Sequence, residues 1–416
     1  MSSPANALPG VAAAGSFQSW FMNKLRMGMS WRDYGRSLVT PFNVFAALVL
    51  VVGLPVIASR FIFGLSAVTE SSNDYPWGLL LGWGLFGGVP LSATGFVIAS
   101  AYYIFGFKKL EPIVRLAVLA GFLGYLFAVF YLLIDLGRPW RIYFPMAVSF
   151  GTASVLFLVA WHVALYLTVQ FLEFSPAILE WLRAERVRRW ARKITIGMTI
   201  AGIMLSTLHQ SALGAMFLLV PGKVHPLWYS QYLPELFLAS GVYVAMAQIV
   251  VIGALVARFM RNRCDAEFLH NLDAITVALG KACAIAMYVY FVMKIVSVAH
   301  DSEWALLGTP YGYWFLLEVL GFVLLPALVL TMASKTSSPG LVRFGSVLAI
   351  VGVLFNRLNV SIFTFNWNLP DHLHEMLPTR HEVAIVATLT VIHILLFRWI
   401  VNRMPVVREE QGFRAH

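Results

Sequence analysis

The chain has 416 residues, of which 59% are hydrophobic and only 12% are charged. A water-soluble domain of this size cannot hide so much apolar surface, so the composition excludes a soluble globular protein and predicts a membrane protein. The net charge of +10 could suggest nucleic-acid binding, but the basic residues gather in short segments between long apolar runs. That placement is typical of loops at a lipid surface, so no nucleic-acid partner is expected.

Apolar runs of about 20 residues recur along the chain, and each can cross a hydrocarbon core of about 30 Å as a helix. Backbone groups in lipid must hydrogen-bond within their own segment, which makes helices the expected structure. The expected fold is therefore all-α and polytopic, with about ten transmembrane helices. The expected spans are 42–66, 77–105, 112–135, 146–171, 194–219, 228–258, 275–299, 311–333, 341–362 and 381–402.

Most of the 30 Lys and Arg residues fall on one side of this topology. The positive-inside rule assigns that side to the cytoplasm, so both termini are expected there. Residues 1–41 form an expected cytoplasmic segment, 42–402 the transmembrane domain, and 403–416 a cytoplasmic tail. Within the membrane we expect one four-helix bundle at about 77–219 and a second at about 228–362, with the first and last spans peripheral.

Two segments outside the spans have a distinctive pattern. Residues 16–36 mix aromatic with basic side chains, which predicts either an amphipathic helix at the membrane interface or a plain leader to the first span. Residues 172–193 are rich in Arg and are expected to be the longest cytoplasmic connection.

Four ionisable residues fall inside expected spans, where an unpaired charge is costly. At 1.5 Å per residue they lie roughly 8–15 Å from the outer ends of spans five, seven, eight and nine. They are His209, Lys294, Glu318 and Arg357. One interpretation is a structural cluster in which Glu318 neutralises Lys294 or Arg357. The other is a polar, hydrated pathway for protons or an ion.

A second group of polar and aromatic residues is expected at the outer mouth of the first bundle. It comprises Trp77, Trp83, Asp135, Arg138, Trp140, Arg141 and Tyr143. An aromatic belt at the interface and a local ion pair between Asp135 and Arg138 would account for it. Alternatively, aromatic walls with a few polar tips would suit the headgroup of a bound ligand.

The second span is rich in glycine and carries Pro90 near its middle, which predicts a kink. The spacing of Gly84 and Gly88 allows close helix packing. The same glycine face could also receive a flat ring such as a quinone headgroup.

The Cys and His residues give no sign of a metal centre. Cys264 and Cys283 form no CxxC pair and are expected at different levels, so neither a disulfide nor a Cys-ligated metal is expected. His162 and His209 are expected in opposite halves of the membrane, which disfavours a haem held between them. His225 falls in an outer loop, where contact with a partner or with solvent is expected.

Five short segments carry distinctive motifs. They are 76–78 (PWG), 135–140 (DLGRPW), 208–214 (LHQSALG), 223–228 (KVHPLW) and 356–360 (NRLNV). In this order they resemble the NrfD/PsrC family of quinone-interacting integral membrane subunits, and most closely its ten-helix, HybB-like branch. The resemblance covers roughly residues 42–402.

The resemblance implies a membrane subunit of a respiratory oxidoreductase complex in a bacterial inner membrane, without catalytic activity when alone. Such a subunit binds menaquinone or ubiquinone and exchanges electrons with a periplasmic ferredoxin-like iron–sulfur protein. The complex would also contain a hydrogenase, molybdopterin-type or multihaem cytochrome subunit, and in some cases other membrane subunits. The chain itself would hold no haem or iron–sulfur cluster, and proton translocation could accompany electron transfer.

The resemblance also implies roles for individual residues. It implies a quinone site near Trp77, Trp83, Gly84 and Tyr143, and Asp135 and Arg138 of the outer polar group complete the expected quinone-binding set. His209, Glu318 and Arg357 fall on matching family positions, and together with Lys294 they form the expected proton or ion pathway.

Two positions depart from the family pattern. Family members often carry His or Asp where this chain has Gly84, and HybB-like members carry a carboxylate in span four where this chain is apolar near Leu158. Two alternative functions therefore stay open. One is a structural membrane anchor without quinone chemistry, and the other is a secondary transporter, which buried ionisable residues and kinked helices would also fit.

Overall fold

A computed structural model describes residues 17–370 and 378–408. Within these ranges ten helical spans are long and apolar enough to cross a membrane. The predicted all-α, polytopic membrane fold is thus confirmed. The chain divides into a small unit, Met1–Leu48, and a large unit, Val49–His416. Residues 1–16 and 409–416, which belong to the expected cytoplasmic segments, lie outside the described residues.

The ten spans include three that contain π-helical turns. In chain order they are α3 (Pro41–Phe63); α4 (Leu79–Leu81), π-helical Gly82–Gly87, α5 (Gly88–Ser92) and α6 (Thr94–Tyr103); α7 (Glu111–Asp135); α9 (Val155–Trp181); α10 (Glu185–Leu218); α11 (Leu233–Phe259); α12 (Ala266–His300); α13 (Pro310–Leu316), π-helical Leu317–Leu324 and α14 (Leu325–Lys335); α15 (Pro339–Leu358) with π-helical Asn359–Phe363; and α16 (Arg380–Arg403).

The remaining helices are short. They are α1 (Phe17–Leu25), α2 (Trp31–Ser37), α8 (Phe144–Ala147) and the 3-10 turns Leu65–Ala67, Lys108–Leu110, Pro139–Arg141, Arg261–Arg263 and Glu303–Gly308. The segment 16–36 is therefore not one helix but two. The break falls at Met27 and Gly28, whose φ angles of 56° and 77° are left-handed and end a right-handed helix.

The expected start of span four at residue 146 is wrong. The helix begins at Val155, because Ser154 caps it and accepts a hydrogen bond from the Phe157 amide at 3.4 Å. Ser and Thr compete with helix by bonding nearby backbone groups, which favours caps and turns in the segment before it.

The long connection expected at 172–193 is also wrong. Helix α9 continues to Trp181 and α10 starts at Glu185, so only a tight turn separates them. Helices α9 and α10 extend beyond the apolar part of their spans because charged residues form ion pairs near the turn between them. Arg188 donates to Glu180 at 2.7 Å, and Arg115 lies 3.2 Å from the same carboxylate.

The second span is interrupted on both sides of Pro90, where a kink was predicted. A π-helical segment precedes the proline and a turn at Ala93 follows it. Proline lacks the N–H that a regular helix needs, and a π-helical turn inserts an extra residue into the ladder of hydrogen bonds. The irregular backbone of this span positions Trp83 and Gly84.

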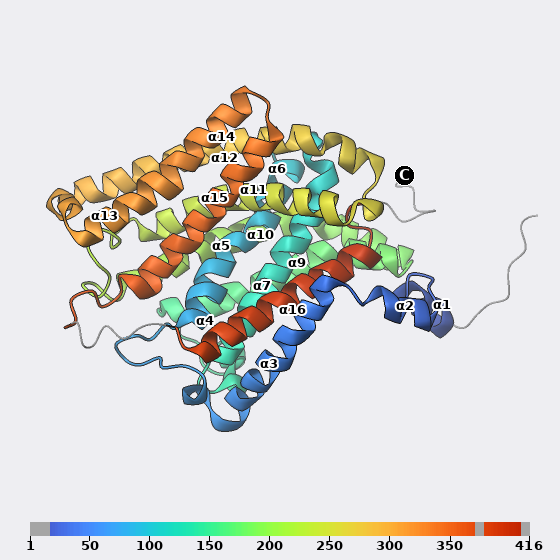
Figure 1. Cartoon of the computed structure of the whole chain (residues 1–416), viewed down its shortest axis with the longest axis horizontal. Helices are drawn as coiled ribbons and strands as arrows, with labels where there is room; N and C mark the ends of the chain where they lie inside the picture. The colour runs from blue at the N-terminus through green and yellow to red at the C-terminus, as the bar shows by residue number, and fades with distance from the viewer. Residues whose placement is uncertain (1–16, 371–377, 409–416) are drawn as a thin grey trace, which may run out of the picture. The chain divides into compact units, whose positions relative to one another are not determined.

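Spans two to nine of the large unit pack as neighbours (Figure 1). Helix α9 packs along α10; α10 also contacts α6 of the second span, and α9 contacts α7. Helix α11 connects the two halves, since it contacts α5, α6 and α10 as well as α12 and α15. Helix α16 runs beside α7 and α4 at the edge (Figure 1).

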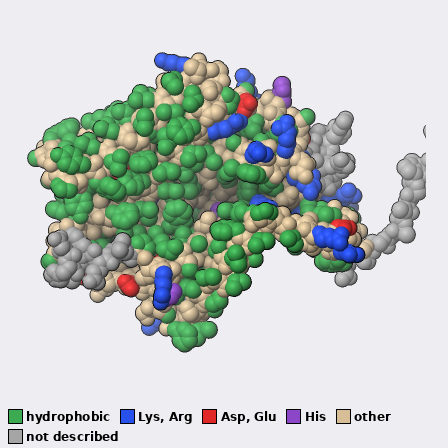
Figure 2. Space-filling model, viewed as in Figure 1, with side chains coloured by type: hydrophobic (Ala, Val, Ile, Leu, Met, Phe, Trp, Pro, Cys, Tyr) green, Lys and Arg blue, Asp and Glu red, His purple; other side chains and the backbone are tan. Residues whose placement is uncertain are grey.

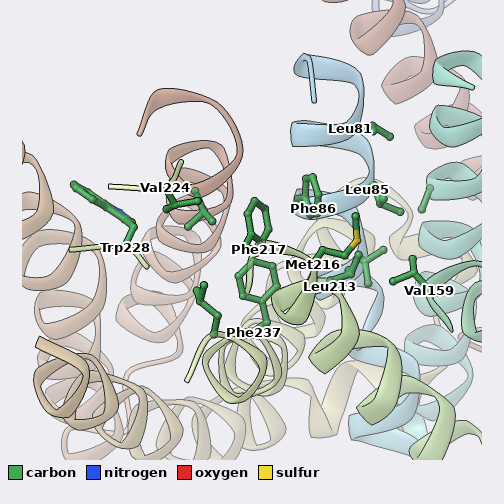
Figure 3. Packing of buried hydrophobic residues seen from close by; sticks show 14 of the residues in the cluster. Leu81, Leu85, Phe86, Val159, Leu213, Met216, Phe217, Val224, Trp228 and Phe237 are labelled. Carbon is green, nitrogen blue, oxygen red and sulfur yellow. The ribbon is translucent and has the colours of Figure 1, made fainter. Parts of the chain in front are cut away.

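The largest apolar core lies where the second, fifth and sixth spans meet the connection after α10. Figure 3 shows the Phe217 ring beside Phe86 and Phe237 within this core, with Trp228 to one side. The Phe217 ring centroid lies 5.1 Å from that of Phe86 and 5.7 Å from that of Phe237. Trp228 is fully buried, so the connection that carries it is anchored inside the protein. This anchoring brings the indole N–H to a carboxylate described below.

On the face shown in Figure 2, the side chains on the outside of the spans are mostly hydrophobic, as contact with lipid requires. Lys and Arg gather towards one end of the large unit (Figure 2). We call this the basic end, which carries the connections 104–110, 182–184, 260–265 and 336–338. The other end, with the connections 64–78, 136–154, 219–232 and 301–309, is called the opposite end.

Candidate functional site

A buried carboxylate lies among the second group of spans. Glu318 is fully buried in the π-helical segment of span eight. Its Oε2 accepts hydrogen bonds from Trp228 Nε1 at 2.7 Å and Asn359 Nδ2 at 2.6 Å, and its Oε1 accepts one from Asn356 Nδ2 at 2.7 Å. Lys294 Nζ lies 3.3 Å from Oε1 and forms an ion pair. These donors together satisfy a charge that would otherwise be costly in a low-dielectric interior.

Arg357 belongs to the same network without touching Glu318. Its guanidinium donates to Asn356 Oδ1 at 2.6 Å and to Ser240 Oγ at 2.6 Å. The charge also lies 3.6 Å from the centre of the Phe237 ring, which is a favourable cation–π distance. Asn356 thus bridges the arginine and the carboxylate through its two amide atoms.

The structure therefore brings together three of the four ionisable residues that the sequence grouped by depth. The charge of Glu318 is neutralised by Lys294, as the structural interpretation requires. His209 is not part of this network, because its ring packs against Tyr125 of α7 with centroids 5.6 Å apart. Depth along a span does not determine which neighbour a side chain faces.

Trp83 and Gly84 lie at a second place, between span two, α7 and α16. Gly84 is buried, and a Cβ added there would overlap the Tyr131 side chain of α7. Trp83 lies beside the Tyr131 hydroxyl, which donates to the Val386 carbonyl at 3.2 Å and lies 3.4 Å from Thr390 Oγ1. The glycine face is thus covered by the aromatic ring of Tyr131, which carries a hydroxyl group.

Asp135 lies one helical turn beyond Tyr131 on the same face of α7, at the opposite end of the spans. Arg60 holds this helix end, since it donates to two backbone carbonyls beside Asp135. Arg60 also attracts the Asp135 carboxylate, whereas Glu382 repels it. We call Trp83, Tyr131 and Asp135 with Gly84 and Arg60 the Tyr131 site.

The remaining quinone-site candidates lie elsewhere. Trp77 packs edge-on against Phe86 and Phe217 inside the main core, with centroids 5.5 and 4.8 Å away. Arg138 and Tyr143 are exposed in the connection after α7, with 54% of Tyr143 accessible. The structure thus brings together only part of the set that the resemblance implies.

The ion pair expected between Asp135 and Arg138 does not form among the described residues. The chain leaves the helix at Leu136, which is extended, so the two residues no longer share a helix face. Arg60, rather than Arg138, is the cation that acts on Asp135.

His225 is also placed differently from the expectation of contact with a partner or solvent. Only 2% of it is exposed, and its Nδ1 accepts a hydrogen bond from the Leu227 amide at 3.2 Å. Its ring packs against Trp228 and Trp367, at centroid distances of 5.6 and 4.8 Å. Burial lowers the pKa of His225 to about 4, so the ring is neutral at physiological pH. The expectation was wrong because the connection folds back onto residues after α15, where its amide donates to the Thr364 carbonyl.

Three residues in or next to the Tyr131 site were not predicted from the sequence. For two of them, Glu382 and Arg60, the sequence contains a recognisable pattern. Glu382 follows Thr379 with the spacing of a helix capping box, which the structure contains, and its Oε1 also accepts from Thr69 and the Leu79 amide. Arg60 is a charge inside an expected span, which is itself a signal. No sequence pattern distinguishes Tyr131, because aromatic residues are common in apolar runs.

Comparison with known proteins gives a consistent set of similarities. Residues 67–365 match the family model described as polysulphide reductase, NrfD. A protein of Nitratidesulfovibrio vulgaris is 40% identical over 389 residues, which cover 93% of this chain and 100% of that protein. The probable Ni/Fe-hydrogenase 2 b-type cytochrome subunit of Escherichia coli is 28% identical, over 90% of this chain and 94% of its own. The menaquinone reductase integral membrane subunit of N. vulgaris is 25% identical, over 66% of this chain and 69% of its own.

Proposed function

This chain belongs to the NrfD family, and we propose that it is the quinone-interacting membrane subunit of a multisubunit respiratory oxidoreductase. The observation that carries the proposal is the family match across spans two to nine, together with a relative named as a subunit of menaquinone reductase. The quinone would be menaquinone or ubiquinone, bound at the Tyr131 site.

The residues of the Tyr131 site fit the chemistry of a quinone headgroup. The indole N–H of Trp83 can donate to a carbonyl oxygen, and the Tyr131 hydroxyl can do so when it exchanges its bond to the Val386 carbonyl for one to the quinone. The carboxyl of Asp135 can accept or supply a proton. The Tyr131 ring fills the space above Gly84. Its phenol therefore offers a polar group near the point where family members often carry His or Asp.

Each residue has a distinct task in this proposal. A bound quinone supplies the two-electron chemistry that joins the partner protein to the quinone pool. Trp83 and Tyr131 orient the ring, Asp135 handles a proton, and Arg60 fixes the end of α7 that carries Asp135. The neighbouring apolar residues of α3 and α16 limit the access of water.

In this proposal the partners dock at one end of the spans. We place the basic end and both termini in the cytoplasm of a bacterial inner membrane, so the Tyr131 site lies towards the periplasm. A periplasmic ferredoxin-like iron–sulfur protein would dock there, with a hydrogenase, molybdopterin-type or multihaem cytochrome subunit behind it. Exposed Arg138 and Tyr143 lie at that end and belong to the docking surface in this proposal.

Proton translocation through Lys294, Glu318 and Arg357 is a second candidate activity. Ionisable groups beside π-helical turns favour it, because such turns often occur at functional sites. The test is Glu318→Gln in the assembled complex. Conduction through this network predicts slower quinone-linked turnover with the complex intact, and normal turnover with normal assembly excludes it.

The main proposal is tested by gentle purification of the protein with its native partners. The extract is analysed for quinone and for the optical and paramagnetic spectra of iron–sulfur or haem groups in the partners. Bound quinone together with metal-bearing partners supports the proposal. A stable complex with metal groups but no quinone favours the structural anchor, and a solitary protein with neither favours a transporter.

A further inference from the structure

His393 lies near the middle of α16, in a part of the span that the proposed function does not use. At about 1.5 Å per residue it is roughly 20 Å from the first residue of the helix and roughly 15 Å from the last. A neutral imidazole has one N–H donor and one acceptor nitrogen, and both are costly in hydrocarbon unless a partner satisfies them. A histidine at this depth therefore needs a hydrogen-bond partner.

The contacts of the His393 ring do not provide that partner. One face of the ring stacks on the Phe127 ring of α7, with centroids 4.4 Å apart and ring planes only 4° from parallel. Among residues 17–370 and 378–408, His393 makes no hydrogen bond and no ion pair. The residue is partly exposed, and neither ring nitrogen is sealed inside the protein. A molecule in the bilayer can therefore reach the polar edge of the ring.

The His393 ring lies about one helical turn from the Tyr131 hydroxyl. On α16, Thr390 precedes His393 by three residues and its Oγ1 lies 3.4 Å from that hydroxyl. On α7, Phe127 precedes Tyr131 by four residues. Residues at these spacings are neighbours on one face of a helix. The contact between α7 and α16 therefore places the imidazole next to the Tyr131 site, about 5 Å further from the opposite end.

The depth of His393 selects the class of ligand. Water and the polar groups of phospholipids lie at the membrane interface, so a polar partner near the middle of the bilayer must itself dissolve in hydrocarbon. A quinone is such a molecule, and its two carbonyl oxygens lie on opposite edges of the ring. Phe130, which is 38% exposed, packs beside Phe127 with centroids 5.5 Å apart and adds an aromatic surface for a flat headgroup.

We infer that His393 donates a hydrogen bond to one carbonyl of the quinone whose other carbonyl is bound by Trp83 and Tyr131. The headgroup then lies lengthwise against the contact between α7 and α16. The inference concerns binding alone, so no covalent bond breaks and no electron moves. It rests on the proposed function, because it needs a quinone at the Tyr131 site. It also gives a part in that site to α16, which lies beyond the residues 67–365 matched by the family model.

Infrared difference spectroscopy of the assembled complex tests the two hydrogen bonds separately. The bound quinone is exchanged for one with an isotopic label at a single carbonyl carbon, which assigns the two C=O stretching bands. His393→Phe keeps an aromatic ring against Phe127 but cannot donate, so one band is expected to move to the frequency of a free carbonyl. Tyr131→Phe is expected to move the other band. If His393→Phe leaves both bands in place, the inference is overturned.

The affinity of the complex for quinone is a second readout. His393→Phe is expected to weaken quinone binding by about tenfold, which is the effect of one lost hydrogen bond. His393→Gln, whose amide N–H can reach the same oxygen, should restore the affinity to within about threefold. His270→Phe is the matched control, because this histidine is exposed near the start of α12 at the basic end. Unchanged affinity in His393→Phe contradicts the inference.

A failure of the proposed function gives a different result. In that case the unaltered complex binds no quinone and shows no carbonyl bands of a bound headgroup, and the inference falls with it. If the bands respond to Tyr131→Phe but not to His393→Phe, the proposed function stands and His393 is removed from the site.

Discussion

Lys294 Nζ and Glu318 Oε1 lie 3.3 Å apart, and at most 4% of either side chain is exposed. A buried pair of this kind keeps its charges only while both partners are present. Removal of one partner leaves an uncompensated charge, at a cost of about 3–5 kcal/mol. The pair joins α12 to span eight and, through Asn356, to Arg357. It is therefore expected to stabilise the second group of spans.

Lys294→Met is predicted to lower the free energy of unfolding by about 3–5 kcal/mol, because Glu318 remains buried without its cation. The measurement is denaturant-induced unfolding in detergent micelles. Lys281→Met is the control on the same helix, since this lysine is exposed, and its effect should stay within about 0.5 kcal/mol. The double variant with Glu318→Gln should be less destabilised than Lys294→Met alone, and an equal or larger loss would contradict a charge-pair role.

Gly84→Ala is predicted to destabilise the protein by about 1–3 kcal/mol, because the new methyl group must displace Tyr131. Gly88→Ala in the same span meets only one atom, at 3.9 Å. It should be neutral or stabilising by about 0.5–1 kcal/mol, since alanine is the better helix former. Thermal unfolding of both variants provides the comparison. Equal melting temperatures would mean that Tyr131 does not need the space above Gly84.

Tyr131→Phe keeps the ring above Gly84 but removes the hydroxyl that we assign to a quinone carbonyl. Loss of one hydrogen bond predicts a fall of about tenfold in the kcat/KM for quinone. The assay is quinone-linked turnover of the assembled complex, with Tyr102→Phe at the basic end as control. An unchanged kcat/KM in Tyr131→Phe would remove this hydroxyl from the site.

His225 predicts a pH dependence of stability. Burial lowers its pKa from 6.5 to about 4, so protonation favours the unfolded state and stability falls as the pH drops from 6.5 towards 4. The expected loss is about 1 kcal/mol at pH 5.5. It is measured as the difference in unfolding free energy between pH 7.5 and 5.5. His225→Asn, which can still accept the Leu227 amide, should lose less, and an equal loss would place the titration elsewhere.

The number and type of spans could be predicted from the sequence because lipid imposes one solution on every long apolar run. Hydropathy says less about where a helix ends. The turn at 182–184 was missed because its charged flanks resembled a loop, whereas Arg188 and Glu180 pair and extend both helices. The cap at Ser154 was likewise missed, because the segment 146–171 was read as one apolar run although Ser149, Gly151 and Thr152 interrupt its start.

The sites were predictable only in part, because lipid makes a charge inside a span conspicuous but does not reveal its neighbours. Lys294, Glu318 and Arg357 were recognisable because charges inside spans are rare, and they do lie in one network. The lateral position of His209 was not predictable, since a depth in the membrane is compatible with many neighbours. Tyr131 could not be found without coordinates, because its role depends on the missing side chain at position 84.

The most direct test of quinone binding at the Tyr131 site is photoaffinity labelling of the assembled complex with an azido-quinone. Labelled peptides are mapped by mass spectrometry, with excess menaquinone as competitor. Quinone binding at the Tyr131 site predicts label on the segments that carry Trp83 and Tyr131, suppressed by the competitor and reduced in Tyr131→Phe. Competed label confined to another part of the chain, or to a partner subunit, would contradict it.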